Sequence, residues 1–259
     1  ARETFEGFGN SLDPNLSKMQ MNFSLYAKET GLIPVSNLTT LFEAMSEGCY
    51  DALLPVCGVR GQAASPLLAG SVSGGYAYIG GSLLVDSEMK TGLAGAAIFS
   101  GSRMVGLLDG QRTQLLLMAR GEFASGRMRL PDGEGGEMSV YLSAVRPPAL
   151  ELSLEERPKA RVRIFLKLSF EQPEVLSGER SDALIEQVRR RLEAGLEELF
   201  TACRALESDV IGFGRLAVRH FSDAEGWESY DWKAAYRMLE AEFSVELELD
   251  RPTEKITLE

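Results

Sequence analysis

Two segments near the end of the chain, residues 161–170 (RVRIFLKLSF) and 243–250 (FSVELELD), alternate apolar and polar residues with a period of two. That period is typical of a strand that is buried on one side only. The charged faces carry Arg161, Arg163 and Lys167 in the first segment, and Glu246, Glu248 and Asp250 in the second. Opposite charges across a strand pair help to fix its register. We therefore expect both segments in one sheet, as neighbours.

The sequence between these strands has the period of helices. Ser181 is a candidate N-cap, and an apolar stripe then continues for about 24 residues, or roughly 36 Å at 1.5 Å per residue. The stripe consists of Leu184, Ile185, Val188, Leu192, Leu196, Leu199 and Cys203. A second helix is expected over residues 230–240, with Trp232, Tyr236 and Leu239 facing the core.

The first part of the chain also mixes both kinds of element. We expect helices over 15–30, 36–48 and 111–119, strands over 51–56 and 137–145, and a hairpin formed by 95–99 and 103–108. Pro147 and Pro148 then interrupt the chain and mark a domain boundary. The predicted fold class is α+β, with two domains, 1–148 and 149–259. Each is a mainly antiparallel or mixed sheet with helices packed on it, and the second has the order β-β-α-α-α-β.

Charge and cysteine content limit the partners. The 259 residues carry a net charge of −11, which argues against nucleic acid and against electrostatic binding to anionic lipid. There is no apolar run of 18 residues and no signal-peptide pattern at the start, although a processed chain would look the same. Cys49, Cys57 and Cys203 have no disulfide or metal-site spacing, so we expect buried free thiols.

The stretch ESDVIGFG (207–214) contains a Gly-x-Gly, which raises the question of phosphate binding. A dinucleotide loop needs a strand before it, a helix after it and a third glycine, yet here a long helix precedes and Ala217 stands in the third position. We interpret Gly212, Phe213 and Gly214 as a joint between packed helices. In it Asp209 caps a helical turn and the glycines allow close packing.

Other candidates for chemistry are weaker. His220 is the only histidine, which excludes a multi-histidine metal site and favours a surface or capping role. SEMKTG (87–92) contains two motifs of penicillin-recognising enzymes, but they share Lys90 instead of lying far apart. The Gly- and Ser-rich residues 58–82 indicate a long loop or insertion. We assign no catalytic, cofactor-binding or metal-binding residue, and the many carboxylates leave glycoside hydrolysis open.

Several segments together resemble the Ger(x)C family, the C subunits of spore germinant receptors. The pattern is carried by Asp209, Gly212, Phe213, Gly214, Trp227, Trp232, Phe243 and Val245. Upstream, residues 93–121 and 30–56 are similar to the family's hairpin and middle segment. Family members begin with a lipoprotein signal, a lipidated cysteine and a further N-terminal domain, so this chain resembles a fragment that lacks them.

The resemblance implies a non-enzymatic protein without cofactors, held by its lipid on the outer face of the spore inner membrane. It implies two integral-membrane partner subunits, of A and B type, in germinant sensing and receptor assembly. A small-molecule germinant is compatible with this role but cannot be assigned to residues. The alternative is a soluble acyl or glycosyl hydrolase with a site near residues 58–82, and a third hypothesis is a solute-binding module outside the cytoplasm.

Overall fold

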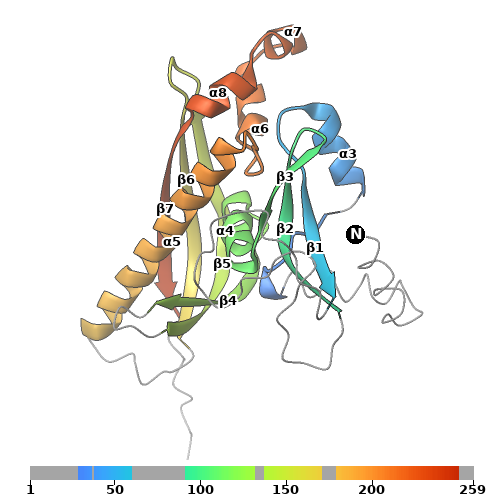
Figure 1. Ribbon diagram of the computed structural model, residues 1–259. Coiled ribbons are helices and arrows are strands. Elements are labelled where there is room, and N and C mark those ends of the chain that lie inside the picture. The colour runs from blue at the N-terminus through green and yellow to red at the C-terminus, as the bar shows by residue number, and fades with distance from the viewer. Residues whose placement is uncertain (1–28, 37, 60–90, 132–136, 171–178, 251–259) are drawn as a thin grey trace, which may run out of the picture.

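The computed structural model describes residues 29–36, 38–59, 91–131, 137–170 and 179–250. They form two sheets with helices packed against them (Figure 1), which confirms the α+β fold class. The strands of the antiparallel sheet β1-β2-β3 are β1 (Leu53–Val59), β2 (Thr91–Ser100) and β3 (Arg103–Leu108). Those of the mixed sheet β4-β5-β6-β7 are β4 (Ser125–Pro131), β5 (Glu137–Ser153), β6 (Lys159–Phe170) and β7 (Glu240–Leu249).

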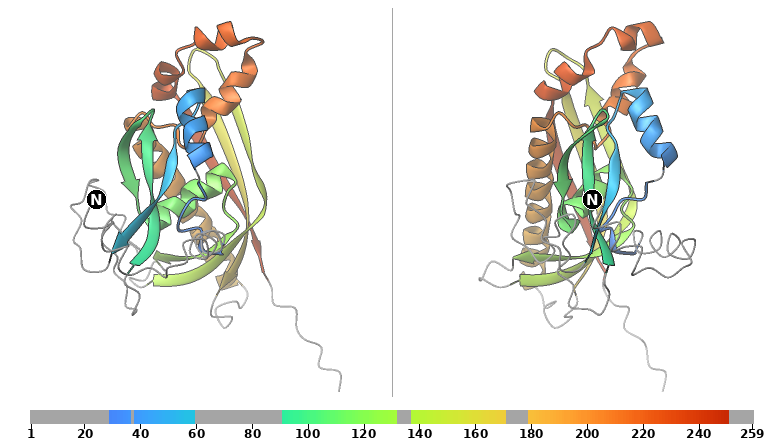
Figure 2. Two further views of the ribbon diagram at one scale, coloured as in Figure 1. Left: turned by 90° about the vertical axis from the view of Figure 1, so that its right-hand side faces the viewer. Right: turned by 45° about the vertical axis from the view of Figure 1, so that its right-hand side comes forward.

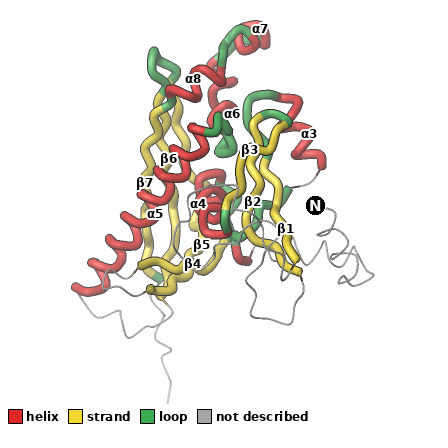
Figure 3. Tube along the Cα trace, in the orientation of Figure 1, coloured by secondary structure: helices red, strands yellow, loops and turns green. Residues whose placement is uncertain are grey.

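The helices lie mainly on one face of the mixed sheet and beside the three-stranded sheet (Figure 2). They are α3 (Leu38–Glu47), α4 (Gly110–Arg120), α5 (Glu179–Ala205), α6 (Phe213–Ala217), the 3₁₀ turn η2 (Val218–His220), α7 (Ala224–Glu228) and α8 (Trp232–Met238). Figure 3 shows the strands of the two sheets as separate groups with α4 between them.

β6 and β7 are neighbours in the mixed sheet, as their charge pattern predicted. They run parallel, with Arg161 opposite Glu242 and Lys167 opposite Glu248. Nε of Arg161 lies 3.2 Å from Oε2 of Glu242, but the two side chains are 74% and 78% exposed. Water therefore screens this pair, and its contribution to stability is on the order of 0–1 kcal/mol. The charges specify register more than they stabilise the sheet.

α4 is the layer that both sheets share. Asp109 caps its first turn by accepting a hydrogen bond from the N–H of Arg112 at 2.7 Å, and Gly121 ends it with φ 74°. Almost every residue from Gly110 to Ala119 is buried. The helix expected over 111–119 is thus confirmed, and its burial on all sides explains why its apolar residues do not form a single stripe.

α5 packs its predicted stripe against the sheet and α4. Val188, Leu192, Leu196, Leu199 and Cys203 are all buried. The helix begins at Glu179, two residues before Ser181, so the expectation that Ser181 is the N-cap is wrong. The apolar stripe located the helix correctly, but it could not fix where the helix begins, because its polar first turn carries no apolar signal.

α5 also satisfies backbone groups of β7, which is an edge strand of the mixed sheet. A carboxylate oxygen of Glu193 accepts a hydrogen bond from the N–H of Val245 at 3.0 Å. The guanidinium of Arg204 donates to the carbonyl of Leu239 at 2.8 Å. Edge strands with unpaired backbone groups invite pairing with another chain. Glu193 reduces that tendency at Val245, and Arg204 holds the residue that directly precedes β7.

The strand expected over 137–145 continues through Pro147 and Pro148 to Ser153. Its register against β6 shifts on both sides of Arg146, and prolines are tolerated in sheets at such irregular positions. The expectation that these prolines interrupt the chain is therefore wrong.

One cluster of buried side chains includes residues from before and after these prolines, among them Leu116 of α4 and Leu196 of α5. The division into domains 1–148 and 149–259 stays a prediction, and this shared cluster weighs against it.

The remaining predictions have mixed outcomes. The hairpin is confirmed as β2 and β3, which pair antiparallel. The elements expected over 36–48, 51–56 and 230–240 are found as α3, β1 and α8, with shifted ends. α6 lies where a helical turn after Asp209 was expected, whereas β4 and the short helix α7 were not predicted. The helix expected over 15–30 lies outside the described residues except for Glu29 and Thr30, which are helical.

Leu116 and Leu196 allow the shared core to be tested. Replacing either with alanine leaves a cavity and is expected to lower the free energy of unfolding by about 2–5 kcal/mol. Because both contribute to one cluster, calorimetry is expected to show a single transition whose midpoint falls in each variant. Met238→Ala, at an exposed position, is the control and is expected to stay within about 0.5 kcal/mol of wild type. Two transitions, each sensitive to one substitution, would contradict the shared core.

Candidate functional site

The carboxylate of Asp209 is the centre of a buried polar cluster. Oδ1 accepts hydrogen bonds from the N–H groups of Gly212 at 2.9 Å and Phe213 at 3.0 Å. Oδ2 accepts from the N–H of Gly214 at 2.7 Å and from Nε1 of Trp232 at 3.2 Å. The N–H groups that a phosphate would need are thus already occupied by a side chain of the chain itself. The interpretation of this stretch as a joint with a capping Asp209 is supported by this geometry.

The two glycines meet different requirements. Gly212 has φ 91°, a left-handed conformation that residues with a side chain rarely adopt. At Gly214 a Cβ atom would lie 1.7 Å from the carbonyl oxygen of Cys49 and 2.6 Å from Nε1 of Trp232. Gly214 therefore lets the loop contact the backbone at Cys49 directly, as the expected close packing requires.

Asp51, which precedes β1, completes the cluster and was not predicted. Its Oδ1 accepts a hydrogen bond from the N–H of Gly101 at 2.7 Å, and its Oδ2 accepts from the N–H of Asp209 at 2.8 Å. The N–H of Asp51 donates to the carbonyl of Asp209 at 3.1 Å. Asp51 thus connects the turn between β2 and β3 to the loop that follows α5. We call Asp51, Ser208, Asp209, Gly212, Gly214, Trp232 and Tyr236 the hub.

The other buried polar groups of the hub also have partners within the chain. Ser208 Oγ donates to the carbonyl of Phe99 at 2.5 Å, and the hydroxyl of Tyr236 donates to the carbonyl of Ser208 at 3.0 Å. Buried polar groups are tolerated when they are satisfied in this way. The hub is therefore arranged to hold three segments together, and its donors are not directed at an open cavity.

Burial raises the pKa of the Asp209 carboxyl to about 6, although the N–H groups of Gly214, Phe213 and Gly212 lower it. The negative charge of Asp51 also raises this pKa. In the unfolded chain the carboxyl has its ordinary pKa of about 3.9. Between these two values only the folded chain holds the proton, so stability from this group is greatest at low pH and is lost as the pH rises through about 6.

The tryptophans of the predicted pattern lie in one aromatic cluster. Trp227 of α7 is partly buried, and its ring centre is 6.4 Å from that of Trp232 and 5.7 Å from that of Phe221. Trp232 and Tyr236 are buried, as expected for a core-facing stripe. The aromatic cluster joins α7 and α8 to the hub through Trp232.

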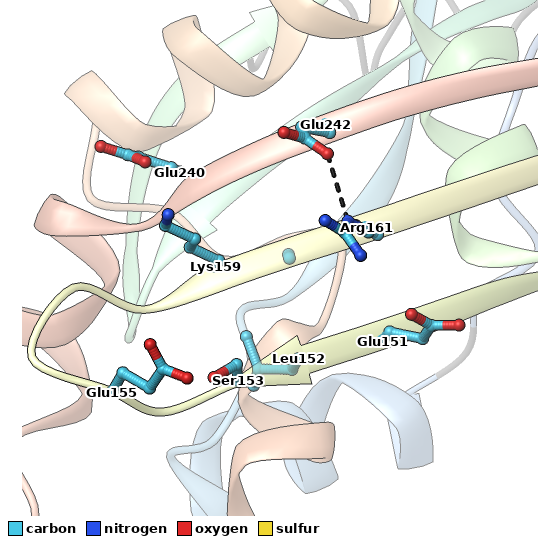
Figure 4. A pocket seen from close by; sticks show the side chains of 9 residues that line it. Glu151, Leu152, Ser153, Glu155, Lys159, Arg161, Glu240 and Glu242 are labelled. Atoms are coloured by element: carbon cyan, nitrogen blue, oxygen red, sulfur yellow. Dashed lines mark hydrogen bonds and ion pairs between the residues drawn. The ribbon is translucent and has the colours of Figure 1, made fainter.

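A second candidate is a hollow of about 380 Å³ on the face of the mixed sheet that α5 does not cover (Figure 4). Figure 4 shows cations of β6 lying between carboxylates of β7 and carboxylates at the end of β5. The cations are Lys159 and Arg161, and the carboxylates belong to Glu240, Glu242, Glu151 and Glu155. Rows of alternating sign attract neither a simple anion nor a simple cation. They suit a protein surface with a matching charge pattern.

The weaker candidates do not converge on a site. His220 is exposed on η2. Residues 87–90 of the SEMKTG motif lie outside the described residues, as does most of the Gly-rich stretch, 60–82. Burial raises the pKa of the Cys203 thiol to about 12 and also raises that of Cys49, so both free thiols are buried and unreactive.

In the part of the chain that the structure describes, no three histidine, cysteine, aspartate or glutamate side chains are placed to hold a metal ion. None of the helices in the described ranges combines the length and apolar character of a membrane span.

The fold and the hub together define an α+β module in which the buried carboxylates of Asp51 and Asp209 connect the three-stranded sheet to the loop after α5. Residues 94–253 match the family described as "Spore germination B3/GerAC like, C-terminal". The match covers more than half of the chain, so the protein belongs to this family of spore germination proteins, as the resemblance predicted.

A solved structure of the GerBC protein shows the same fold, with a TM-score of 0.59 and 12% identity. The similarity covers 85% of this chain but 62% of the GerBC chain, so this chain spans less than two thirds of that protein's length. No curated protein matches the sequence. That Asp209, Gly212, Phe213, Gly214, Trp227 and Trp232 are the family's shared structural pattern stays a prediction.

The packing of Gly214 can be tested against Gly212. Gly214→Ala is expected to destabilise the chain by about 3 kcal/mol or more, because the loop must move away from Cys49. Gly212→Ala is expected to cost about 1–2 kcal/mol, because only the left-handed backbone is strained there. Chemical denaturation of both variants measures the difference. Equal losses would mean that the close contact at Gly214 is unimportant.

The pKa of Asp209 predicts an unusual pH dependence. The free energy of unfolding of wild type minus that of Asp209→Asn is expected to increase as the pH falls from about 7 to about 4.5, by up to about 1.4 kcal/mol per pH unit. Titrating groups that do not interact with Asp209 cancel in this difference. An NMR titration of the Asp209 carboxyl carbon gives the pKa directly. A difference that shrinks toward low pH would show that the N–H donors outweigh burial and keep Asp209 ionised.

Proposed function

We propose that this chain is part of the non-enzymatic C subunit of a spore germinant receptor, acting in germinant sensing and receptor assembly. The observation that carries the proposal is the family match over residues 94–253. This region includes the mixed sheet and the loop of Asp209. Since the chain spans 62% of the GerBC chain, the activity of the whole subunit involves more than the segment described.

The proposed partners are two integral-membrane subunits, of A and B type, at the outer face of the spore inner membrane. The net charge of −11 would oppose adhesion to anionic lipid. An N-terminal lipid on the full-length protein would supply the attachment, and since one acyl chain binds only marginally, partner contacts would add to it.

A non-enzymatic role is supported by how the hub uses its polar groups. Asp51, Ser208, Asp209 and Tyr236 all bond to other parts of the chain. A catalytic carboxylate or hydroxyl must instead face a substrate. The hub is thus better suited to positioning the surfaces around it.

The surface that we propose for partner contact is the charged face of the mixed sheet. Arg161 and Arg163 extend from β6 and pair with Glu242 and Glu151 at 3.2 and 3.8 Å. These exposed pairs contribute little to stability. They are therefore available to re-pair with charges of a partner, which would give specificity more than affinity.

The proposal predicts the phenotype of spores that lack this gene. Deletion is expected to abolish or strongly reduce germination with at least one nutrient, while a trigger that bypasses nutrient receptors still works. The fall in optical density after nutrient addition measures the response, and the wild-type gene is expected to restore it. Unchanged germination with every nutrient to which the strain responds would refute the proposal.

The partner surface is tested by complementation with Arg161→Glu/Arg163→Glu. This variant is expected to fold but not to restore the response, because its two reversed charges would repel the partner's matching charges. Arg190→Glu/Arg191→Glu, two exposed positions on α5, is the matched control and is expected to restore it. Restoration by both variants would exclude the sheet face as the contact while leaving the receptor role intact.

A further inference from the structure

A hollow of about 200 Å³ lies between the end of α4 and the part of β5 whose register against β6 is irregular. The register shifts on both sides of Arg146, so the segment of β5 around it is longer than the segment of β6 that it faces. Val145 is 46% exposed in this bulge, and Pro147 is exposed as well. Of the described residues that line the hollow, Arg146 alone is charged. The bulge therefore combines exposed apolar side chains, an apolar hollow and one cation.

This part of β5 is also an edge of the mixed sheet. β4 pairs with β5 only as far as Ser143, and the N–H of Ala144 then donates to the carbonyl of Ala124 at 2.8 Å. Beyond that point none of the described strands pairs with this side of β5. A bulge and prolines in such an edge hinder the addition of a further strand, because the bulge disrupts the ladder and proline has no N–H to donate. The bulge is therefore suited to contacts made by side chains.

The guanidinium of Arg146 has an aromatic partner but no anionic one. It lies over the ring of Phe165, 3.5 Å from the ring centre. No carboxylate among the residues that the structure describes forms an ion pair with it. Arg163 and Lys167, two residues to either side of Phe165 on β6, each have a carboxylate, at 3.8 and 2.6 Å. A guanidinium that stacks on a ring still directs its N–H groups outward in its own plane, so Arg146 can bind a carboxylate from outside.

The size of the hollow favours a side chain of a protein partner over a free small molecule. Pockets that enclose small ligands usually have volumes of about 300–1,000 Å³, whereas this hollow has about 200 Å³. Interfaces between proteins are often centred on a few anchor side chains that fill small pockets, and arginine is common among the residues that dominate their binding energy. An apolar hollow beside a stacked arginine fits this second description.

We propose that the bulge of β5 docks a segment of another protein, which inserts one apolar side chain into the hollow and places an aspartate or glutamate carboxylate on the guanidinium of Arg146. The apolar side chain provides the buried area. The carboxylate fixes the orientation of the segment and excludes segments with a basic residue at that position. This docking site lies beside the charged pairs of Arg161 and Arg163, and it depends neither on them nor on the proposed receptor function.

Photocrosslinking in intact spores tests the docking. The full-length protein carries p-benzoylphenylalanine in place of Val145, and irradiation is expected to join this residue to an apolar residue of a second protein, which mass spectrometry identifies. Adding Arg146→Glu is expected to reduce the adduct by about tenfold or more, because two carboxylates then face each other. Arg191→Glu, at an exposed position on α5, is the matched control and is expected to leave the adduct unchanged.

The crosslinked protein then allows the reciprocal test. Replacing its acidic residue nearest to the adduct with arginine is expected to restore the adduct with Arg146→Glu, since the pair is then reversed. Circular dichroism of the 259-residue chain checks that Arg146→Glu keeps the wild-type fold. If it does not, Arg146→Gln, which removes only the charge, is used with the same expected loss. The proposal is overturned by an adduct with lipid or with a second copy of this chain, by an adduct that survives loss of the Arg146 charge, or by no adduct.

Discussion

The buried carboxylate of Asp209 is the interaction on which the rest of the structure depends. An isolated charge in a protein interior costs several kcal/mol, and hydrogen bonds must offset that cost. Here the backbone of residues 212–214 and the indole of Trp232 provide four donors. Asp51, which precedes β1 of the three-stranded sheet, accepts a hydrogen bond from the N–H of Asp209 and so links this loop to that sheet. Loss of any one partner would leave a buried charge or donor unsatisfied, so these segments are held together as a unit.

Much of the fold could be predicted from the sequence because its strongest signals are local. The alternating charges of β6 and β7 and the apolar stripe of α5 each define an element within one continuous segment. β4 escaped prediction because its alternation is short and only Met128 and Leu130 contribute apolar side chains to the buried face, where Gly126 has none. The prolines of β5 suggested a boundary because proline usually ends strands, but an irregular register accommodates them.

The site was predictable in part for the same reason. Asp209 and the glycines lie within six residues of each other, so capping and close packing could be inferred from their spacing. Asp51 lies 158 residues from Asp209, and no local pattern connects the two. An acidic residue directly before a buried strand was the available signal, because a carboxylate in that position needs internal donors. Which donors it finds depends on tertiary structure alone.

The hub and α5 together restrict how a partner can bind to the mixed sheet. Strand addition at the β7 edge would compete with Glu193 of α5, which already accepts a hydrogen bond from the N–H of Val245. The inner face is filled by α4 and α5. The outer face is open, and exposed cations of β6 lie there between carboxylates on both sides. A partner that binds this outer face must match its charge pattern, which makes recognition sensitive to ionic strength and selective for one orientation.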